Sequence, residues 1–318
     1  MNNDRIQEIL DLMEEARLDY FLISDPQSIA YCTGYYNDPH ERMFVFMISK
    51  HGNHTLFMND LFYLDHDLDV NIVWHKDGQD AIQTIVDEMH FPGRIGIDKN
   101  WASHFLLDLM KKLPDAKYIN ASPCVDLVRM KKDLQEQVLM IESSKINDAV
   151  MEEIIPFIQE GVTEKQLAKK LDELFFNHHS TCYGAIVAFG KNAADPHHEN
   201  DDTLLRKGDC VLIDMGCVYK GYCSDMTRTF FYEGILEEEI KVYEIVKKAN
   251  EAAEAMIKPG VKLSDIDKCA RKVISDEGYG KYFTHRLGHF IGRDVHEYGD
   301  VSSVNEMEVE EGMIFSIE

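Results

Sequence analysis

Three acidic residues and one histidine stand out because each lies in or beside an apolar, strand-like segment. They are Asp214, Asp225, His289 and Glu318. Asp214 follows the apolar run 211–213, where an ionised carboxylate without a partner is costly to bury, so such groups pair, take up a proton or bind a metal. Carboxylates with one imidazole are typical ligands of hard or borderline ions. We therefore expect these four residues to bind Mn²⁺, Co²⁺ or Mg²⁺, with Zn²⁺ a further possibility.

The pairing of two strand-like segments, 211–215 and 224–231, determines how close two of these carboxylates lie. If Tyr219 and Lys220 are the central turn residues, Asp214 and Asp225 are directly opposed, with Cβ atoms roughly 4.5–5.5 Å apart. Like charges so placed are destabilising unless a cation lies between them. A surface-facing pair and a proton-sharing carboxylate dyad remain alternatives, because Tyr-Lys is not a typical pair for such a turn.

His289 is bracketed by Gly288 and Gly292, and His296 follows seven residues later. Glycines on both sides indicate a close backbone approach to another group. A single histidine among apolar residues more often has a structural role, and that alternative stays open at this point. The chain has no C-x-x-C pair, so a thiolate-rich zinc site is not indicated.

The segments that must position these residues fall into two parts. Residues 1–125 alternate helix and strand patterns, which predicts an α/β domain. The expected strands are 20–23, 43–48, 55–58, 71–74, 94–98 and 118–119, with a hairpin around 51–54, and the expected helices lie around 6–13, 79–89 and 102–112. Residues 126–318 form the second predicted domain, and its first stretch, 126–160, is almost wholly helical in pattern.

The second part repeats its own layout. Gly161-Val and Gly260-Val each precede an amphipathic helix, with Thr163 and Ser264 as candidate N-caps. Each follows a long predicted helix, 134–160 or 236–257, and each is followed by strands. We expect two helix-helix-strand-strand halves around a pseudo-twofold axis, with their strands in one curved sheet. Chance similarity is the alternative, since Gly-Val before a capped helix is common.

Composition excludes several classes of partner. The net charge of −24 argues against nucleic acid and against anionic membranes, since both require clustered Lys and Arg. Seven cysteines, an odd number, include several within apolar strand patterns, which favours a reducing compartment. We see no signal peptide and no apolar run long enough to span a membrane. A cytoplasmic protein is expected.

Five ordered motifs resemble the signature of the pita-bread metallopeptidases, closest to the bacterial Xaa-Pro dipeptidases (prolidases) and to aminopeptidase P. Residues 1–125 resemble the creatinase-type N-terminal domain, and 38–42 is similar to bacterial prolidases in particular. The motifs are Ile186-Val-Ala-Phe-Gly-Lys-Asn-Ala-Ala-Asp-Pro-His-His198, Leu212-Ile-Asp-Met-Gly216, Gly221-Tyr-Cys-Ser-Asp-Met-Thr-Arg-Thr229, Gly288-His-Phe-Ile-Gly292 with His296-Glu297, and Gly312-Met-Ile-Phe-Ser-Ile-Glu318.

The resemblance implies a role for each matching residue. Asp214 would bind one metal and Asp225 would bridge two, Mn²⁺ being the first expectation for both ions. His289 and Glu318 would bind the second, and Glu318 would also act as general base. His197, His285 and His296 match the substrate-side histidine, a histidine near the leaving group and the oxyanion donor. A homodimer is expected, with a proline-containing dipeptide or short peptide as substrate.

One departure from the family pattern qualifies these roles. Family members continue past the position of Glu318 into another strand, which supplies a second bridging glutamate, so we expect the natural chain to be longer than 318 residues. The resemblance predicts Xaa-Pro dipeptidase activity. The alternatives are aminopeptidase P activity on longer peptides and a non-catalytic, peptide-binding relative. A metal-free creatinase-like hydrolase is disfavoured because the acidic ligands are present.

Overall fold

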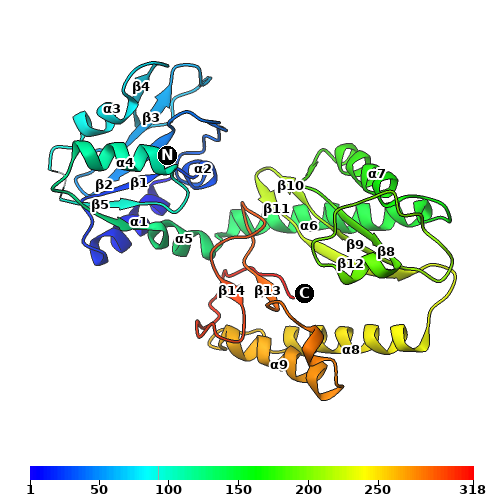
Figure 1. The fold of residues 1–318 in the computed structure, drawn as a ribbon. Coiled ribbons are helices and arrows are strands. Elements are labelled where there is room, and N and C mark those ends of the chain that lie inside the picture. Colours follow the sequence, from blue (N-terminus) through cyan, green and yellow to red (C-terminus); the bar gives the residue numbers. More distant parts are fainter. Residues whose placement is uncertain (92) are drawn as a thin grey trace. The chain divides into compact units, whose positions relative to one another are not determined.

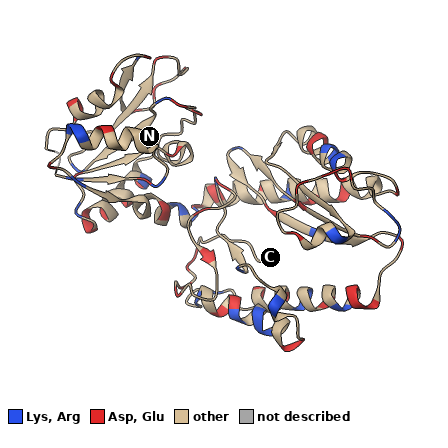
Figure 2. Cartoon of the chain, viewed as in Figure 1, with Lys and Arg blue, Asp and Glu red and all other residues tan. Residues whose placement is uncertain are grey.

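The computed structural model describes residues 1–91 and 93–318, and their contacts divide the chain into two compact units (Figure 1). The N-terminal unit is Met1–Arg129 and the C-terminal unit is Met130–Glu318. The division falls near the end of helix α5 (Ser122–Met130), a few residues after the boundary expected at 125. Acidic residues are spread over the helices and loops of both units (Figure 2).

The N-terminal unit is a six-stranded mixed sheet in the order β4-β3-β2-β1-β5-β6. Apolar side chains on both faces of the sheet pack into two separate cores. The predicted alternation is confirmed, and the predicted hairpin joins β2 to β3. The strands are β1 (Tyr20–Ile23), β2 (Val45–Ser49), β3 (Thr55–Asn59), β4 (Asn71–His75), β5 (Arg94–Ile97) and β6 (Lys117–Asn120), and the helices before α5 are α1 (Asn3–Glu15), α2 (Pro26–Thr33), α3 (Ala81–Glu88) and α4 (Ser103–Lys112).

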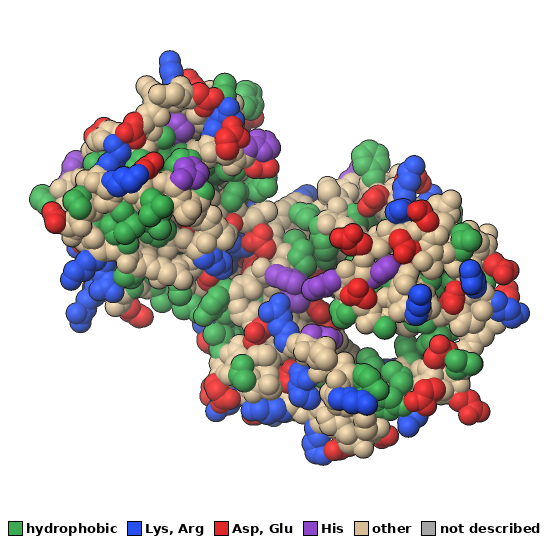
Figure 3. All heavy atoms as spheres, viewed as in Figure 1, with side chains coloured by type: hydrophobic (Ala, Val, Ile, Leu, Met, Phe, Trp, Pro, Cys, Tyr) green, Lys and Arg blue, Asp and Glu red, His purple; other side chains and the backbone are tan. Residues whose placement is uncertain are grey.

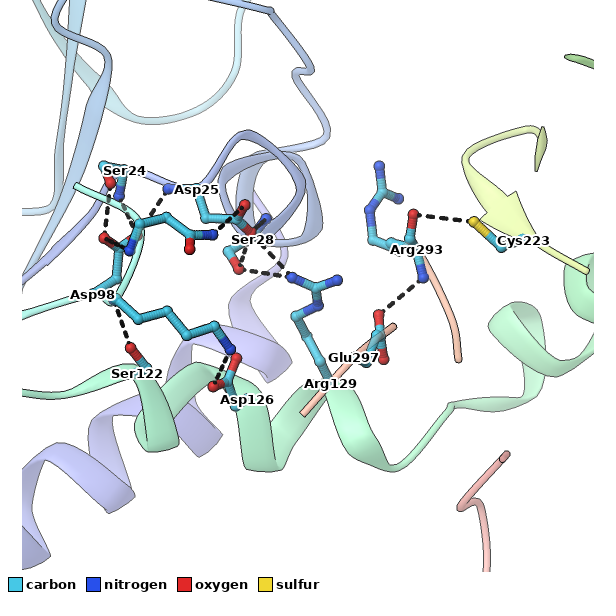
Figure 4. Close-up of polar contacts among 12 residues, drawn as sticks. Ser24, Asp25, Ser28, Asp98, Ser122, Asp126, Arg129, Cys223, Arg293 and Glu297 are labelled. Atoms are coloured by element: carbon cyan, nitrogen blue, oxygen red, sulfur yellow. Dashed lines mark hydrogen bonds and ion pairs between the residues drawn. The ribbon is translucent and has the colours of Figure 1, made fainter. Parts of the chain in front are cut away.

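Buried polar contacts fasten helix α5 within this unit (Figure 4). Asp25 caps α2 by accepting from the Ser28 N–H at 2.8 Å, and the same oxygen accepts from Arg129 of α5 at 3.1 Å. Asp98 accepts from the backbone N–H groups of Ser24 and Asp25 at 2.6 and 2.8 Å. These charge-assisted bonds satisfy carboxylates that burial would otherwise penalise.

The C-terminal unit contains the two predicted halves, with the long helices somewhat shorter than expected. The first half consists of α6 (Leu134–Ile154), the 3₁₀ turn η1 (Ile155–Phe157), α7 (Glu164–Asn177), β7 (Thr181–Cys182), β8 (Ile186–Phe189), η2 (Gly190–Ala194), β9 (Cys210–Met215), β10 (Cys217–Tyr219), β11 (Tyr222–Cys223) and β12 (Met226–Phe231). The second half consists of α8 (Glu237–Glu254), α9 (Leu263–Asp276), η3 (Gly280–Tyr282), β13 (Gly288–His289) and β14 (Asp300–Val301). Their strands form three small sheets, β11-β10-β7, β12-β9-β8 and β13-β14, rather than the single curved sheet expected.

Hydrogen bonding shows that the repeat is structural and not a chance similarity. Gly161 and Gly260 both have positive φ, at 84° and 86°. Their N–H groups donate to the carbonyls of Leu205 and Val309 at 3.0 and 2.9 Å. Leu205 and Val309 each donate back to the residue that follows the glycine. In each half, the same pair of backbone hydrogen bonds thus joins the turn before the second helix to a later segment of that half.

One of the two predicted helix caps is confirmed. Thr163 caps α7 in a reciprocal capping box with Gln166. Ser264 does not cap α9, because the N-cap of that helix is Lys262, two residues earlier. The Ser264 hydroxyl instead donates to Glu306 at 3.0 Å.

The predicted strand register is wrong. Asp214 lies opposite Thr227, not Asp225, and Tyr219 pairs with Tyr222. The central turn residues are therefore Lys220 and Gly221, with φ of 48° and 82°. Two positive φ values define the turn that matches the twist of a hairpin, and glycine adopts them without strain. Asp225 then lies between β11 and β12, on the diagonal from Asp214.

No helix among residues 1–91 and 93–318 combines the length and the apolar character that a membrane span needs.

Candidate metal centre

Asp225, His289 and Glu318 converge in the C-terminal unit. Nε2 of His289 lies 3.2 Å from Oδ2 of Asp225 and 2.9 Å from Oε1 of Glu318. The three ligand atoms all lie within 4.8 Å of one another. Backbone pairing sets the position of Glu318, because its N–H donates to Leu287 and the Ser316 N–H donates to His289, both at 2.8 Å.

The remaining hydrogen bonds of His289 and Glu318 orient their side chains. Nδ1 of His289 lies 3.2 Å from the carbonyl of Phe290, which places a proton on Nδ1 and turns Nε2 toward the carboxylates. The Ser316 hydroxyl donates to Oε1 of Glu318 at 2.7 Å. Partners of this kind fix the ring orientation of a metal-binding histidine and hold a carboxylate in place.

Asp214 lies beside this group on β9. Thr227 on the paired strand β12 donates its hydroxyl to Oδ1 of Asp214 at 2.9 Å. Burial, reinforced by the charges of Asp225 and Glu318, raises the pKa of Asp214 to about 6, against the smaller opposing effects of Thr227 and His289. Carboxylates crowded in this way require a positive charge nearby.

His289 supplies that positive charge when no metal is bound. Burial alone would lower its pKa, but hydrogen bonds to Asp225, Glu318 and the Phe290 carbonyl raise the pKa to about 9. Burial raises the pKa of Glu318, but the bonds from His289 and Ser316 and the charges of His289 and His285 bring it below its usual value. An imidazolium thus stands between carboxylates at the position where a divalent cation would satisfy them. The four residues fit a metal of the hard or borderline class.

Two further side chains complete the site, and sequence reasoning missed both. Thr227 holds Asp214, as described above. The Tyr183 hydroxyl donates to the Ser224 carbonyl at 2.8 Å, and burial followed by the charges of Asp225 and Asp214 strongly raises the pKa of Tyr183. A hydroxyl residue in a strand is ordinary in sequence. The sequence position of Thr227 could have indicated its role. Thr227 follows Asp225 by two residues, and side chains two residues apart on a strand face the same side.

His296 lies beside the candidate metal centre. Its ring centroid lies 4.0 Å from that of His289, and burial together with the nearby positive charges of His289 and Arg286 lowers the pKa of His296. The adjacent Glu297 holds this loop by accepting from buried Lys132 at 2.9 Å and from the Arg293 N–H at 2.9 Å, the second of which is drawn in Figure 4.

His285 and His197 differ in how firmly they are held. His285 precedes β13 by three residues, and its Nδ1 lies 2.6 Å from the Arg286 carbonyl. His197 has an exposed side chain in the turn after η2, where its backbone N–H donates to Asp195 at 3.1 Å. The neighbouring His198 turns inward to Glu164 at 2.6 Å. Several histidine side chains gather on the visible face of the C-terminal unit (Figure 3).

Glu164, His198 and Asp201 form a second group with the spacing of metal ligands. Glu164 is fully buried, and its Oε1 accepts from the Phe189 N–H at 2.8 Å and from Asn192 at 2.9 Å. Its Oε2 accepts from His198 and from the Asp201 N–H at 3.1 Å. Both oxygens are therefore occupied by donors. These bonds fasten α7 to the loop after β8.

Comparison with known proteins agrees with this geometry. Residues 138–318 match the model of metallopeptidase family M24, and residues 5–131 match the creatinase/prolidase N-terminal domain. The chain therefore belongs to metallopeptidase family M24, and the expected pita-bread architecture with a creatinase-type N-terminal domain is confirmed.

Individual relatives resemble the chain over nearly its whole length. An uncharacterised peptidase of Staphylococcus aureus (strain bovine RF122 / ET3-1) is 33% identical, over 99% of this chain and 90% of the relative. A dipeptidase from Pyrococcus horikoshii is 34% identical with a TM-score of 0.91, over 98% of this chain and 89% of that structure. An Xaa-Pro dipeptidase from Bacillus anthracis is 26% identical with a TM-score of 0.90, over 99% of this chain and 88% of that structure.

Proposed function

We propose that this metallopeptidase is a two-metal Xaa-Pro dipeptidase that hydrolyses the bond preceding proline. The convergence of Asp225, His289 and Glu318 beside Asp214 is the observation that carries the proposal. Likeness to an Xaa-Pro dipeptidase and to a dipeptidase supports the choice of substrate. Mn²⁺ is the first candidate for the metal, with Co²⁺ or Zn²⁺ as alternatives, because the proposed ligands are three carboxylates and one imidazole.

Each residue of the centre has a proposed task. Bound divalent ions would polarise the scissile carbonyl and lower the pKa of a water. Asp214 and Asp225 would hold the cations together with His289 and Glu318, and Asp225 would serve both ions. Glu318, whose carboxyl stays ionised, accepts the proton of the attacking water. His296 donates a hydrogen bond to the developing oxyanion, and His285 passes the proton that Glu318 has taken from the water to the proline nitrogen as it leaves. His197 would contact the substrate from its exposed turn.

Hydrolysis of Leu-Pro by the purified protein in Mn²⁺ tests the proposal. Asp225→Asn should abolish turnover while the far-UV CD spectrum is unchanged, because the amide cannot supply a bridging carboxylate. Asp202→Asn is the matched control, since Asp202 is exposed and pairs with Lys165. Absence of both bound metal and hydrolysis in the unaltered protein would leave the non-catalytic, peptide-binding alternative.

A second candidate is aminopeptidase P activity, which removes one residue ahead of proline from longer peptides. The proposed metal ligands are the same for both activities, so the metal centre does not distinguish a dipeptidase from an aminopeptidase P. Comparing the rates of hydrolysis of Leu-Pro and Leu-Pro-Pro at equal concentrations distinguishes them. A dipeptidase prefers Leu-Pro. Faster cleavage of Leu-Pro-Pro would show aminopeptidase P activity instead of dipeptidase activity.

We also propose a cytoplasmic homodimer. The seven cysteines are free thiols in the structure, as a reducing compartment would keep them. The proposal of a dimer is based on the family resemblance. In such a dimer, the segment 38–42 of one subunit would reach the substrate pocket of the other. Arg42 of this segment is held by two bonds to Asp77 at 3.0 and 2.9 Å. Light scattering after size exclusion gives the mass, and a monomer would reject this part of the proposal.

A further inference from the structure

Helix α9 carries an acidic and a basic residue four positions apart that form a bidentate pair. Nε and Nη2 of Arg271 each donate to one carboxylate oxygen of Asp267, both at 2.9 Å. The Asp267 side chain is fully buried, whereas that of Arg271 is about a third exposed, at 31%. A buried carboxylate requires a partner, and the planar guanidinium matches both of its oxygens.

The pair does more than neutralise itself, because it also binds the chain segment that leads into β13. Nη1 of Arg271 donates to the carbonyl of Phe283, and Nη2 donates to the carbonyl of His285, both at 2.9 Å. Oδ1 of Asp267 accepts from the N–H of Leu287 at 3.2 Å. Three backbone groups within five residues are thus fixed to one point on helix α9.

The segment held in this way carries His285. The guanidinium carbon of Arg271 lies 4.3 Å from the centre of the Phe283 ring, and that ring packs edge-on against the His285 ring at 4.9 Å and 85°. Nδ1 of His285 donates to the Arg286 carbonyl at 2.6 Å. A proton on Nδ1 leaves Nε2 as the nitrogen that can take up a proton and pass it on.

We propose that Arg271 and Asp267 are positioning residues that fix the orientation and tautomer of His285 beside the metal centre. The inference deepens the proposed function, since it assigns the groups that hold the proton donor for the leaving nitrogen. If the pair only stabilised helix α9, any cation opposite Asp267 would serve. A lysine presents one ammonium group instead of a planar fork, so it can keep the ion pair but cannot also hold both carbonyls.

The first test measures the histidine itself in metal-free protein and needs no activity. Long-range ¹H–¹⁵N spectra of histidine-labelled protein report the tautomer of each ring, with the His285 signals assigned by His285→Gln. The unaltered protein should show His285 protonated at Nδ1. Arg271→Lys and Arg271→Gln should shift these signals toward an averaged tautomer. Lys272→Gln is the control, because Lys272 pairs with Asp276 in solvent. Unchanged signals in both Arg271 variants would overturn the proposal.

The second test is kinetic, with Mn²⁺ and Leu-Pro. We expect Arg271→Lys to lower kcat by about tenfold to a hundredfold, the range that a misplacement of about 1 Å costs, with KM and Mn²⁺ affinity unchanged. The thermal midpoint of Arg271→Lys should remain close to that of the control. Loss of Mn²⁺ affinity in parallel with kcat would show a general structural role and reject the proposal. If the unaltered protein hydrolyses no substrate, the proposed function fails, whereas the spectra still decide the inference about His285.

Discussion

At the scale of single residues, the proposed ligands stand out in the sequence because acidic side chains are unusual in or beside apolar strands. Asp214 interrupts an apolar strand, and a carboxylate in such a run is costly to bury unless it pairs, takes up a proton or binds a metal. Tyr183 and Thr227 could not be predicted in the same way. Their hydroxyl groups act on Ser224 and Asp214 through hydrogen bonds that only the folded chain creates. A residue that supports a ligand leaves no anomaly in its own sequence.

The raised pKa of His289 predicts proton release when a metal binds. In metal-free protein this imidazole has a pKa of about 9 and is therefore protonated at pH 7. A metal binds the neutral ring only, so Mn²⁺ should displace about one proton from His289 at pH 7. The release should decline as pH rises through 9, where the metal-free ring has already lost its proton. Below pH 6, Asp214 adds a second proton to be displaced.

Titration calorimetry in PIPES and in Tris measures this release, because the two buffers differ in ionisation enthalpy. The apparent binding enthalpy at pH 7 should differ between them, and the difference should shrink toward pH 10. His289→Asn should bind Mn²⁺ more weakly and release fewer protons at pH 7. Equal enthalpies in both buffers at pH 7 would show that His289 is neutral before the metal arrives.

At the scale of elements, the sequence predicted which strands exist but not their register. The segment Val218–Gly221 allowed two placements of the turn, and the choice depended on which residue adopts a positive φ. Gly221 in the second central position was the available signal. The repeat of the two halves was predicted correctly from Gly161 and Gly260, because both glycines have the positive φ that their turns require. The N-cap of α9 was not, because the residue in that position is Lys262 and makes no side-chain cap.

Gly216 connects the two parts of the β-hairpin that carry Asp214 and Asp225, and it predicts a sharp mutational effect. A Cβ at this position would lie 1.9 Å from the Tyr183 hydroxyl and 2.1 Å from the Ser224 carbonyl oxygen. Gly216→Ala should therefore lower the free energy of unfolding by about 1–3 kcal/mol or more, the cost of an overpacked core. Mn²⁺ affinity should fall with it, since Ser224 precedes Asp225. Urea denaturation and Mn²⁺ titration measure the two effects.

Gly234→Ala provides the matched control for this substitution. Its φ is not in the left-handed region, and a Cβ there would meet its nearest atom at 3.5 Å, an ordinary contact. The control should change the free energy of unfolding by less than about 1 kcal/mol, which is the range of a Gly-to-Ala exchange without strain. If the two variants unfold at the same urea concentration, close packing at Gly216 is not what shapes the hairpin.

At the scale of the whole molecule, the change from an α/β alternation to a long helical stretch was enough to predict two domains. The exact boundary between the two units was harder to predict. Helix α5 continues beyond residue 125, and Arg129 near its end binds Asp25 of the N-terminal unit. A contact between residues so far apart in sequence depends on the folded sheet. Each unit has its own apolar core, so each can respond separately to a ligand.

That independence predicts that Mn²⁺ stabilises only one of the two units. All four proposed ligands lie in Met130–Glu318, whereas both tryptophans of the chain, Trp74 and Trp101, lie in Met1–Arg129. At a free Mn²⁺ concentration of about 100 Kd, binding adds about 2.7 kcal/mol to the unit that holds the metal, which raises its thermal midpoint by roughly 5–10 °C. Tryptophan fluorescence should show a midpoint that Mn²⁺ does not move, while calorimetry shows a second transition that it does. Asp225→Asn should abolish the shift. A fluorescence midpoint that rises with the calorimetric one would mean that the two units unfold as a single cooperative body.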